Sequence, residues 1–391
     1  MPAELEVVRV PGPEPGAGAG WRARAERWAG LEPQWSRWWR AGTLACGRTI
    51  SGVDILYTWM SPFESAEPIA RLARELGKPW VADLGDPWAL DEMFVYPSRA
   101  HRWLELRRMR RALEGAAAVV MSTREAACRL QARFPEFRGK LVVSIPNGFD
   151  AHDFEGDPPV RNDDAFRIVH TGYLHTELGL RQRRSSRLRR LLGGSVRGVD
   201  FLTRSHVFLL EAIESLIEQE PSLRSRIEIH LAGVLSNADT RYTRLSGLVR
   251  TPGYLPHDET VELMRSADLL FLPMHDLPTE ARAGIVPGKT YEYLASERPI
   301  LAAVPDGDAR DLLEAAGTAR LCRPADVEGL KTAIREAIAR RQAGAPVPPP
   351  SPDLLLRYEY TRLTGELADV FDAVLARDRT RPLASLPALG G

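Results

Sequence analysis

The chain of 391 residues is 44% hydrophobic and 27% charged, which describes a globular protein with apolar material for two cores. Its 52 Lys and Arg balance its 52 Asp and Glu, which excludes a global field that attracts nucleic acid or an anionic membrane. Three scattered cysteines argue against a disulfide framework or a cysteine zinc site, and no apolar run approaches the ~18 residues of a membrane span, so we expect a protein of the reducing cytoplasm.

Short apolar runs alternate with amphipathic helical patterns through most of the chain, which is typical of parallel sheets with crossover helices. In the first half, the expected strands are 5–10, 54–59, 79–84, 116–121 and 140–145, with helices at 66–76, 99–114 and 123–134. In the second half, the expected strands are 166–172, 227–234, 250–254, 268–273, 299–304 and 318–322, with helices at 204–219, 258–266, 288–297, 308–316 and 325–341. The sequence therefore predicts an α/β fold with two doubly wound, Rossmann-like domains.

Composition also suggests where the domains meet. Residues 151–165 are rich in turn formers, acids and prolines, so we interpret them as a linker between an N-terminal domain (1–150) and a C-terminal domain (166–343). The proline-rich start of 344–376 indicates a stiff connector, which leads into a helix that must dock elsewhere on the protein. Residues 377–391 are expected to form a tail.

The segment VPGKTYE, residues 286–292, combines groups that suit a nucleotide. Pro287 fits the first position of a helix, and Gly288 allows another group to approach the backbone. Lys289 then lies in the first turn, where a cation is unfavourable unless an anion such as a phosphate is near. Glu292 shares the helix face with Lys289 and can accept hydrogen bonds from the hydroxyls of a ribose. An ordinary solvated Lys–Glu pair would show the same pattern.

Five segments together resemble family 4 retaining glycosyltransferases, which have the GT-B fold. VPGKTYEYLASERPIL (286–301), followed by DGDARDLL, is similar to the nucleotide-binding segment of that family. PWVADLGDPW (79–88), IPNGFD (145–150), HTGYL (170–174) and GYLPHDETVELMRSADLLFLP (253–273) resemble other segments of the family in the same order. The resemblance covers most of residues 50–375. It implies two Rossmann-like domains that face a cleft and a C-terminal helix that crosses back to the first domain.

The resemblance also implies roles for particular residues. Glu292 would hold the donor ribose, Lys289 would face the diphosphate, and Arg204 stands where the family has a second cation, although it could be an ordinary helix residue. The first glutamate of the paired motif is replaced here by Gly284, and the backbone amides of 284–288 could substitute for it. The full set of expected donor contacts is Gly172, Arg204, Gly233, Gly253, Tyr254, Leu255, Gly284, Gly288, Lys289 and Glu292.

The implied reaction moves a sugar from a nucleoside diphosphate sugar to a hydroxyl of a glycan or lipid-linked acceptor, with retention, in cell-surface polysaccharide synthesis. Lys289 and Arg204 would stabilise the leaving diphosphate, so no metal ion or other cofactor is expected. Asp86 would orient or deprotonate the acceptor, and Trp88 would stack on a sugar face, unless Asp-Pro-Trp is only a structural turn. His170 and His206 are interpreted as core or capping residues.

Two basic segments stand out against the neutral net charge. Residues 21–42 interleave five tryptophans with arginines, which suits a membrane interface or a sugar-binding surface; alternatively, a helix packs these rings on the first sheet. Residues 181–204 contain eight arginines and one acid in an expected long loop, which could close over a diphosphate, meet a lipid phosphate or stay solvated. Either segment could give peripheral contact with the inner membrane face. Without a recognised binding fold, we expect no nucleic-acid partner.

The opening PAELEVVRVPGPEP resembles the second strand of such a domain rather than its first. We therefore expect either a true start further upstream or the loss of an element that lines the cleft. Together with Gly284, this keeps open a non-catalytic nucleotide-binding or sugar-binding remnant. A nucleotide-sugar epimerase would share the architecture, but it needs acids and histidines around the sugar that the sequence does not locate.

Overall fold

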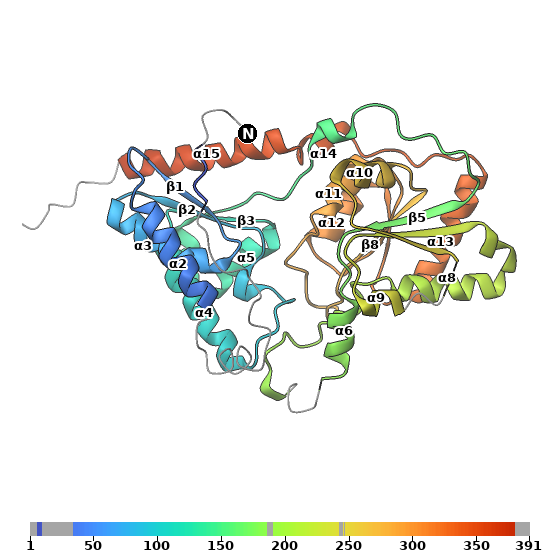
Figure 1. Cartoon of the computed structure of the whole chain (residues 1–391), viewed down its shortest axis with the longest axis horizontal. Coiled ribbons are helices and arrows are strands. Elements are labelled where there is room, and N and C mark those ends of the chain that lie inside the picture. Colours follow the sequence, from blue (N-terminus) through green and yellow to red (C-terminus); the bar gives the residue numbers. More distant parts are fainter. Residues whose placement is uncertain (1–5, 10–33, 186–190, 242–244, 246, 380–391) are drawn as a thin grey trace, which may run out of the picture.

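The computed structural model describes residues 6–9, 34–185, 191–241, 245 and 247–379. These residues form two α/β domains that lie side by side, each around a parallel sheet (Figure 1). The predicted α/β architecture with two Rossmann-like domains is confirmed. Within the described part of the chain, no helix combines the length and hydropathy that crossing a bilayer requires.

The first domain contains a four-stranded sheet in the order β1-β2-β3-β4. Its strands are β1 (Leu56–Trp59), β2 (Trp80–Leu84), β3 (Ala118–Met121) and β4 (Leu141–Ser144), and its α-helices are α2 (Gln34–Gly47), α3 (Ala66–Leu76), α4 (Arg99–Glu114) and α5 (Arg124–Arg133). Every connection steps in the same direction, so α3, α4 and α5 pack on one face of the sheet. The described part of this sheet therefore lacks the reversal that makes a sheet doubly wound.

The strand expected at 5–10 is not formed by its described residues. Residues 6–9 have no regular structure, and the side chains of Val7 and Val8 are 48% and 63% exposed. The physical reason is that a strand requires a neighbouring backbone to complete its hydrogen bonds, and none pairs with these residues.

A long C-terminal helix, α15 (Tyr360–Arg379), covers the other face of the first sheet. After α14 (Pro352–Leu356), the chain passes from the second domain back to the first, and Figure 1 shows α15 in red above β1 to β3. Val370 and Val374 pack against Val81 and Val120 of the sheet. The predicted crossing helix is thus confirmed, although it continues to Arg379 instead of ending before the tail expected from residue 377.

The crossing is fixed at the end of the first domain. The N–H of Phe149 donates to the carbonyl of Tyr358 (3.0 Å), and the N–H of Tyr360 donates to the carbonyl of Phe149 (3.0 Å). A Cβ on Gly148 would lie only 2.2 Å from the Tyr358 oxygen. The glycine of the IPNGFD segment is therefore required by close packing of two backbones.

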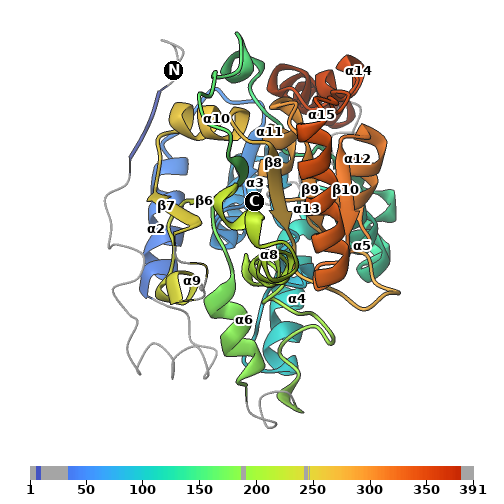
Figure 2. The same cartoon turned by 90° about the vertical axis from the view of Figure 1, so that its right-hand side faces the viewer.

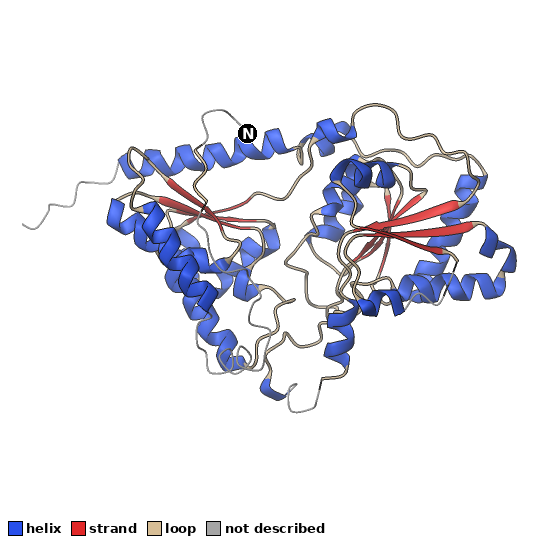
Figure 3. Ribbon diagram, viewed as in Figure 1, coloured by secondary structure: helices blue, strands red, loops and turns tan. Residues whose placement is uncertain are grey.

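The second domain contains a six-stranded sheet in the order β10-β9-β8-β5-β6-β7. Its strands are β5 (Phe166–Thr171), β6 (Ile227–Ala232), β7 (Val249–Gly253), β8 (Leu269–Pro273), β9 (Ile300–Ala303) and β10 (Ala319–Cys322). Its helices are α6 (Thr176–Arg183), α8 (Val207–Gln219), α9 (Asn237–Arg241), α10 (His257–Arg265), α11 (Lys289–Ala295), α12 (Asp308–Ala316) and α13 (Val327–Gln342). The order reverses between β5 and β8, and helices cover both faces of this sheet (Figures 2 and 3).

Local hydrogen bonds shift two predicted helices. The helix expected from 204 begins at Val207, because the hydroxyls of Thr203 and Ser205 bond to the carbonyls of Asp200 (2.8 Å) and Leu202 (2.5 Å) and hold this stretch in turns. The long loop expected from 181 is partly helical, since α6 extends to Arg183. Of that loop, residues 186–190 lie outside the described part.

The tryptophan-rich segment is described only from residue 34. There α2 packs on α3, and the indole N–H of Trp39 donates to the hydroxyl of Ser65 (3.0 Å). Trp35 stacks on Trp39 with ring centroids 5.6 Å apart. The described half of 21–42 therefore packs on the first domain, against a helix rather than the sheet, and residues 21–33 lie outside the described part.

Candidate functional site

Three glycines gather at the carboxyl ends of neighbouring strands. Gly172 and Gly233 directly follow β5 and β6, and Gly253 ends β7, with φ of 94°, 135° and 83°. The N–H of Gly172 donates to the carbonyl of Ala232 (2.8 Å), and the N–H of Gly233 donates to the carbonyl of Gly253 (2.7 Å). A Cβ on Gly233 would lie 2.7 Å from the Gly172 oxygen, so this edge of the sheet requires glycine and leaves bare backbone.

Lys289 reaches the same edge from the segment after β8. Its Nζ donates to the carbonyl of Thr171 and lies 3.3 Å from Nε2 of His170. Nδ1 of His170 lies 3.0 Å from the carbonyl of Phe271, so we assign the ring proton to Nδ1 and the acceptor role to Nε2. The amine thus sits where the strand order reverses between β5 and β8, the place where sheets of this kind bind ligands.

A second cation, Arg204, accompanies Lys289. Burial, together with the charge of Arg204, lowers the pKa of Lys289 to about 7. No carboxylate forms an ion pair with Lys289 or Arg204 among the described residues. Burial also holds the pKa of His170 well below its ordinary value, so this ring stays neutral. Two neighbouring basic side chains that form no ion pair with a carboxylate suit an anionic ligand.

Helix α11, which begins at Lys289, adds little to the positive charge of this site. α11 contains only seven residues, Lys289 is its first residue, and Gly288 is its cap, so Pro287 precedes the helix instead of starting it. A Cβ on Gly288 would meet its nearest atom, Nδ2 of Asn147, at an ordinary 3.9 Å. The helix therefore begins two residues after the predicted start at Pro287, and the expected close approach of another group to Gly288 stays a prediction. The side chains of Lys289 and Arg204 supply the positive charge.

Glu292 has a carboxylate without a hydrogen-bond partner in the described part of the chain. It is half-buried, and burial raises its pKa, which the nearby His257 and Lys289 counteract. Tyr254, 80% exposed, and the half-buried Leu255 follow the glycine at the end of β7. Glu292 is therefore available to ligand hydroxyls, as its expected role requires.

Arg204 faces acids of the first domain. Its backbone carbonyl accepts from the N–H of His175 (2.9 Å), and its half-buried guanidinium lies near Asp86 and Asp91. The carboxylate of Asp86 is exposed, but surrounding protein atoms raise its pKa, and the charge of Arg204 acts in the opposite direction. The structure thus brings the predicted Asp86 and Arg204 together across the two domains.

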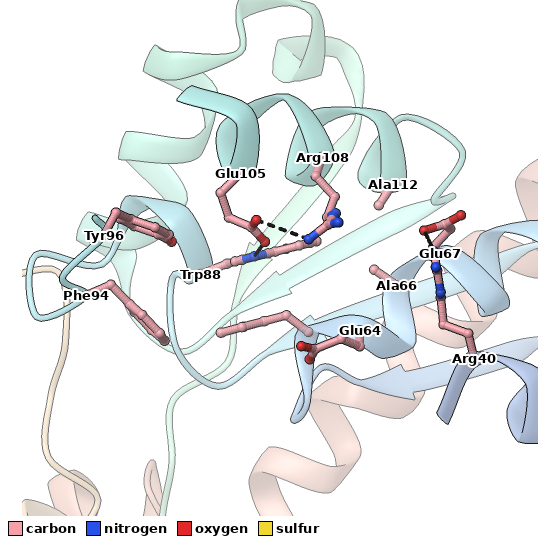
Figure 4. A pocket seen from close by; sticks show the side chains of 11 residues that line it. Arg40, Glu64, Ala66, Glu67, Trp88, Phe94, Tyr96, Glu105, Arg108 and Ala112 are labelled. Carbon is pink, nitrogen blue, oxygen red and sulfur yellow. Dashed lines mark hydrogen bonds and ion pairs between the residues drawn. The ribbon is translucent and has the colours of Figure 1, made fainter. Parts of the chain in front are cut away.

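Trp88 does not present its ring to an acceptor. The side chain is 2% exposed, and its face is stacked on Phe63 with centroids 5.2 Å apart. The indole N–H donates to Glu105 (2.9 Å), as the dashed line in Figure 4 shows. The predicted stacking of Trp88 on a sugar is therefore wrong in this structure, because Phe63 already occupies the ring face. Trp88 instead forms a wall of a small pocket of about 170 Å³ beside Phe94 and Glu105 (Figure 4).

Glu92 joins the two domains next to Gly284. It is 2% exposed and accepts from His275 Nε2 (3.1 Å), the Gly284 N–H (2.9 Å) and Arg129 Nη1 (2.6 Å). The carbonyl of Gly284 accepts from the hydroxyl of Thr123 (2.7 Å). Both backbone groups of Gly284 thus bond to the first domain, so its own amide is not free for a donor. The expectation that backbone amides of 284–288 substitute for the missing glutamate stays a prediction for the other residues of that segment.

The ionisable side chains at this contact between the two domains have pKa values shifted in different directions. Burial opposes ionisation of Glu92, but hydrogen bonds from His275 and Gly284 and the charge of Arg129 hold its pKa below the ordinary value. Burial lowers the pKa of His275, so a neutral imidazole donates to a carboxylate. Asp91, which is 5% exposed, differs, because burial, together with the charges of Glu92 and Asp86, raises its pKa to about 7.

The sequence analysis did not identify Asp91, Glu92, Arg129 and His275. The only local signal is an acidic pair in the otherwise apolar stretch ALDEMF, after the same strand as Asp86. Its partner His275 is 183 positions away and follows β8 directly. Within the described residues, no group of three or more His, Cys, Asp or Glu is arranged to hold a metal ion.

Comparison with known proteins agrees with this geometry. Residues 200–340 match the family model described as Glycosyl transferases group 1. No curated protein matches the sequence. The resemblance to group 1 glycosyltransferases is thus confirmed for the segment that carries Arg204, Lys289 and Glu292.

Several solved structures share the fold. Anabaena HepE in complex with UDP and glucose is 17% identical, with a TM-score of 0.58 over 85% of this chain and 82% of its own. A UDP-forming trehalose-phosphate synthase from Burkholderia xenovorans is 16% identical, with a TM-score of 0.57 over 90% and 81%. Sucrose-phosphate synthase from Thermosynechococcus elongatus is 13% identical, with a TM-score of 0.57 over 87% and 78%. These similarities confirm the GT-B fold.

Proposed function

We propose that this chain is a retaining glycosyltransferase of the hexosyltransferase type. It moves a sugar from a nucleoside diphosphate sugar to a hydroxyl of a glycan or lipid-linked acceptor, in cell-surface polysaccharide synthesis on the cytoplasmic side of the inner membrane. The observation that carries the proposal is the pair of basic side chains, Lys289 and Arg204, at the strand reversal, which form no ion pair in the described residues and lie opposite Asp86. The UDP and glucose named for the HepE structure support a donor of this class.

In this proposal, each part of the donor meets a different group. The diphosphate lies against Lys289, Arg204 and the bare backbone at Gly172, where positive charge and close approach coincide. The two ribose hydroxyls donate to the carboxylate of Glu292. The base lies beside the ends of β6 and β7, near Gly233, Gly253, Tyr254 and Leu255.

The proposed reaction breaks the bond between the anomeric carbon and the phosphate oxygen and forms one from that carbon to the acceptor oxygen. Negative charge grows on the departing diphosphate, and Lys289 and Arg204 are fixed where they stabilise it, so we propose that no resident metal or other cofactor is needed. Asp86 orients the acceptor hydroxyl, whose proton passes to Asp86 or to the departing phosphate. Retention then places the new bond on the face that the phosphate leaves.

The first test is calorimetric binding of UDP, GDP, ADP and dTDP to the chain and to Glu292→Ala. We expect selective binding of one nucleotide and at least about tenfold weaker binding by the variant, because the ribose hydroxyls lose a charged acceptor. Glu218→Ala, which removes an exposed glutamate of α8, is the matched control and should bind like the unchanged chain. Absence of binding by all four nucleotides, or equal binding by both variants, would contradict the donor site.

A second candidate is a non-catalytic nucleotide-binding protein. It is favoured by the first-domain side chains that occupy both backbone groups of Gly284. Incubation with the donor of the selected nucleotide distinguishes the candidates: release of the nucleoside diphosphate in the presence of glycan acceptors supports transfer, and binding without turnover supports the second candidate. An epimerase would instead return a donor with an altered sugar, which proton NMR detects.

A further inference from the structure

Helix α4 carries an unusual combination of side chains on the lower edge of the molecule in Figure 1. Its sixteen residues include six arginines and two glutamates. Trp103 and Leu104 lie on it and are 48% and 54% exposed. The guanidinium of Arg107 covers part of the Trp103 ring at 4.6 Å. The helix thus presents a large aromatic and an aliphatic side chain within a strongly basic surface.

The second domain extends this surface. The N–H of Tyr96, just before α4, donates to the carbonyl of Gly194 (2.9 Å), and a Cβ on Gly194 would lie 1.7 Å from the Tyr96 oxygen. This contact fixes residues 191–197 against the start of α4. Figures 1 and 2 both show α4 and α6, which leads into this region, at the same end of the molecule.

A groove of about 1200 Å³ lies between the two domains at this point. The first domain contributes Arg102 and Trp103 to its lining, and the second contributes Arg183, Leu191 and Arg197. Leu191 is 82% exposed. A smaller hollow of about 270 Å³ shares Trp103 with the groove and adds three more arginines, Arg107, Arg110 and Arg133. We call α4 together with residues 191–197 and these hollows the α4 surface.

Few acids neutralise the α4 surface. Asp200 pairs with Arg183 (2.7 Å), Glu105 with Arg108 (3.2 Å) and Glu136 with Arg110 (3.4 Å). Arg99, Arg102 and Arg197 form no ion pair within the described ranges. Since the net charge of the whole chain is +0, this positive charge is a local feature and not a consequence of composition.

We propose that the α4 surface binds a bilayer that contains anionic phospholipids. Arginines attract the phosphate headgroups of such lipids, tryptophan favours the headgroup level, and the exposed leucines gain by burial among acyl chains. A nucleic acid would satisfy the arginines but would leave Leu104 and Leu191 in water. The proposal assigns peripheral contact to α4 and not to residues 34–42, whose Trp39 is bonded within the first domain. It does not depend on the proposed transfer reaction.

The test is co-sedimentation of the full chain with vesicles of phosphatidylcholine alone and vesicles with an equal amount of phosphatidylglycerol. We expect binding to the mixed vesicles only, weakened by added salt. Neutralisation of one arginine at an anionic surface weakens binding about fivefold, so Arg99→Gln with Arg102→Gln should weaken it about 25-fold. Trp103→Ser with Leu104→Ser should weaken it several-fold at low and high salt alike.

The matched charge control is Arg224→Gln with Arg340→Gln, which removes two exposed arginines of the second domain without ion pairs in the described residues. Leu356→Ser, at a leucine that is 60% exposed in α14, is the apolar control. Circular dichroism and urea midpoints establish that all variants are folded.

Equal vesicle binding by the α4 and control variants, or no binding by the unchanged chain, would overturn the proposal. Tighter binding to a DNA oligonucleotide that Trp103→Ser with Leu104→Ser leaves unchanged would also overturn it, in favour of nucleic acid.

Discussion

The side-chain amine of Lys289 changes its protonation state near neutral pH. Its amine bonds to the Thr171 carbonyl and lies beside a neutral His170, and burial brings its pKa to about 7. A bound diphosphate would stabilise the charged form and raise this pKa. In the unliganded protein, the amine is therefore largely neutral above about pH 7, and binding of the diphosphate requires uptake of a proton.

The affinity for a nucleoside diphosphate should therefore fall with increasing pH above about 7, by up to about tenfold per pH unit until the pKa of the complex is reached. The second phosphate ionisation, near pH ~6, is complete in this range and does not contribute. Calorimetry in buffers of different ionisation enthalpy measures both the affinity and the proton uptake. Lys289→Arg keeps its charge and should give a flat profile; a slope in this variant equal to that of the unchanged chain would assign the proton elsewhere.

At the scale of single residues, part of the site can be predicted from the amino-acid sequence alone. Gly172, Gly233 and Gly253 each lie near the end of an expected strand, and the ends of parallel strands meet at one edge of a sheet. Glu92 could not be predicted, since nothing near it in the chain indicates a partner 183 positions away. The error at Trp88 has a similar cause, because its ring face is covered by Phe63, which precedes β2.

At the scale of elements, the segment after β2 and the segment after β8 are joined by one buried carboxylate. Glu92 accepts three hydrogen bonds from His275, Gly284 and Arg129, and no water reaches it easily at 2% exposure. Its removal would leave the guanidinium of Arg129 without its nearest carboxylate and the N–H of Gly284 without an acceptor. The contact also holds the loop before Lys289 in place relative to the first domain.

Glu92→Ala should lower the free energy of unfolding by about 3–5 kcal/mol, because the Arg129 side chain, which is 25% exposed, and a buried N–H lose their partner together. Glu314→Ala, which removes an exposed pair with Arg310 (3.1 Å), should cost less than about 1 kcal/mol. Urea unfolding monitored by tryptophan fluorescence measures both changes. If the two variants have the same midpoint, Glu92 is not a structural link between the domains.

The elements themselves differ in how well they were predicted. The helices at 66–76, 99–114 and 308–316 agree with α3, α4 and α12 because each has a long apolar stripe and a glycine directly after its end. The helix expected at 204–219 starts three residues late because two hydroxyls compete for the backbone. The run at 5–10 has the residues of a strand, but strand formation depends on a neighbour that composition does not reveal.

At the scale of the whole molecule, α15 acts as a cover for the first domain. Val370 and Val374 bury the sheet face that carries Val81, Ala118 and Val120, and the ring of Phe371 lies 5.5 Å from that of Tyr57. This apolar face would meet water without the helix. The first domain is therefore completed by residues more than two hundred positions further along the chain.

Val374→Ala should lower the free energy of unfolding by about 1–3 kcal/mol, because it removes buried methyl groups between α15 and the sheet. Asp372→Ala, two positions earlier on the exposed side of α15, should change it by less than about 0.5 kcal/mol. Thermal unfolding of both variants provides the comparison. Equal melting temperatures would indicate that α15 does not contribute to the stability of the first domain.

The overall architecture was predictable, but the order of the strands was not. Alternating apolar runs and helical stripes indicate two α/β units, and the resemblance of VPGKTYEYLASERPIL and the other segments indicates GT-B. Periodicity does not tell which strands are neighbours. The reversal between β5 and β8 and its absence among β1 to β4 are decided by how the crossovers pack, which depends on contacts across the whole domain.

The position of α15 also has a consequence for synthesis of the protein. A ribosome completes β1 to β4 well before Tyr360 is translated, so the nascent first domain emerges with one face of its sheet uncovered. Until α15 packs on the sheet, Val81, Ala118 and Val120 are open to chaperones or to another nascent sheet. Chains that stop short of α15 would retain this apolar surface, which quality control recognises.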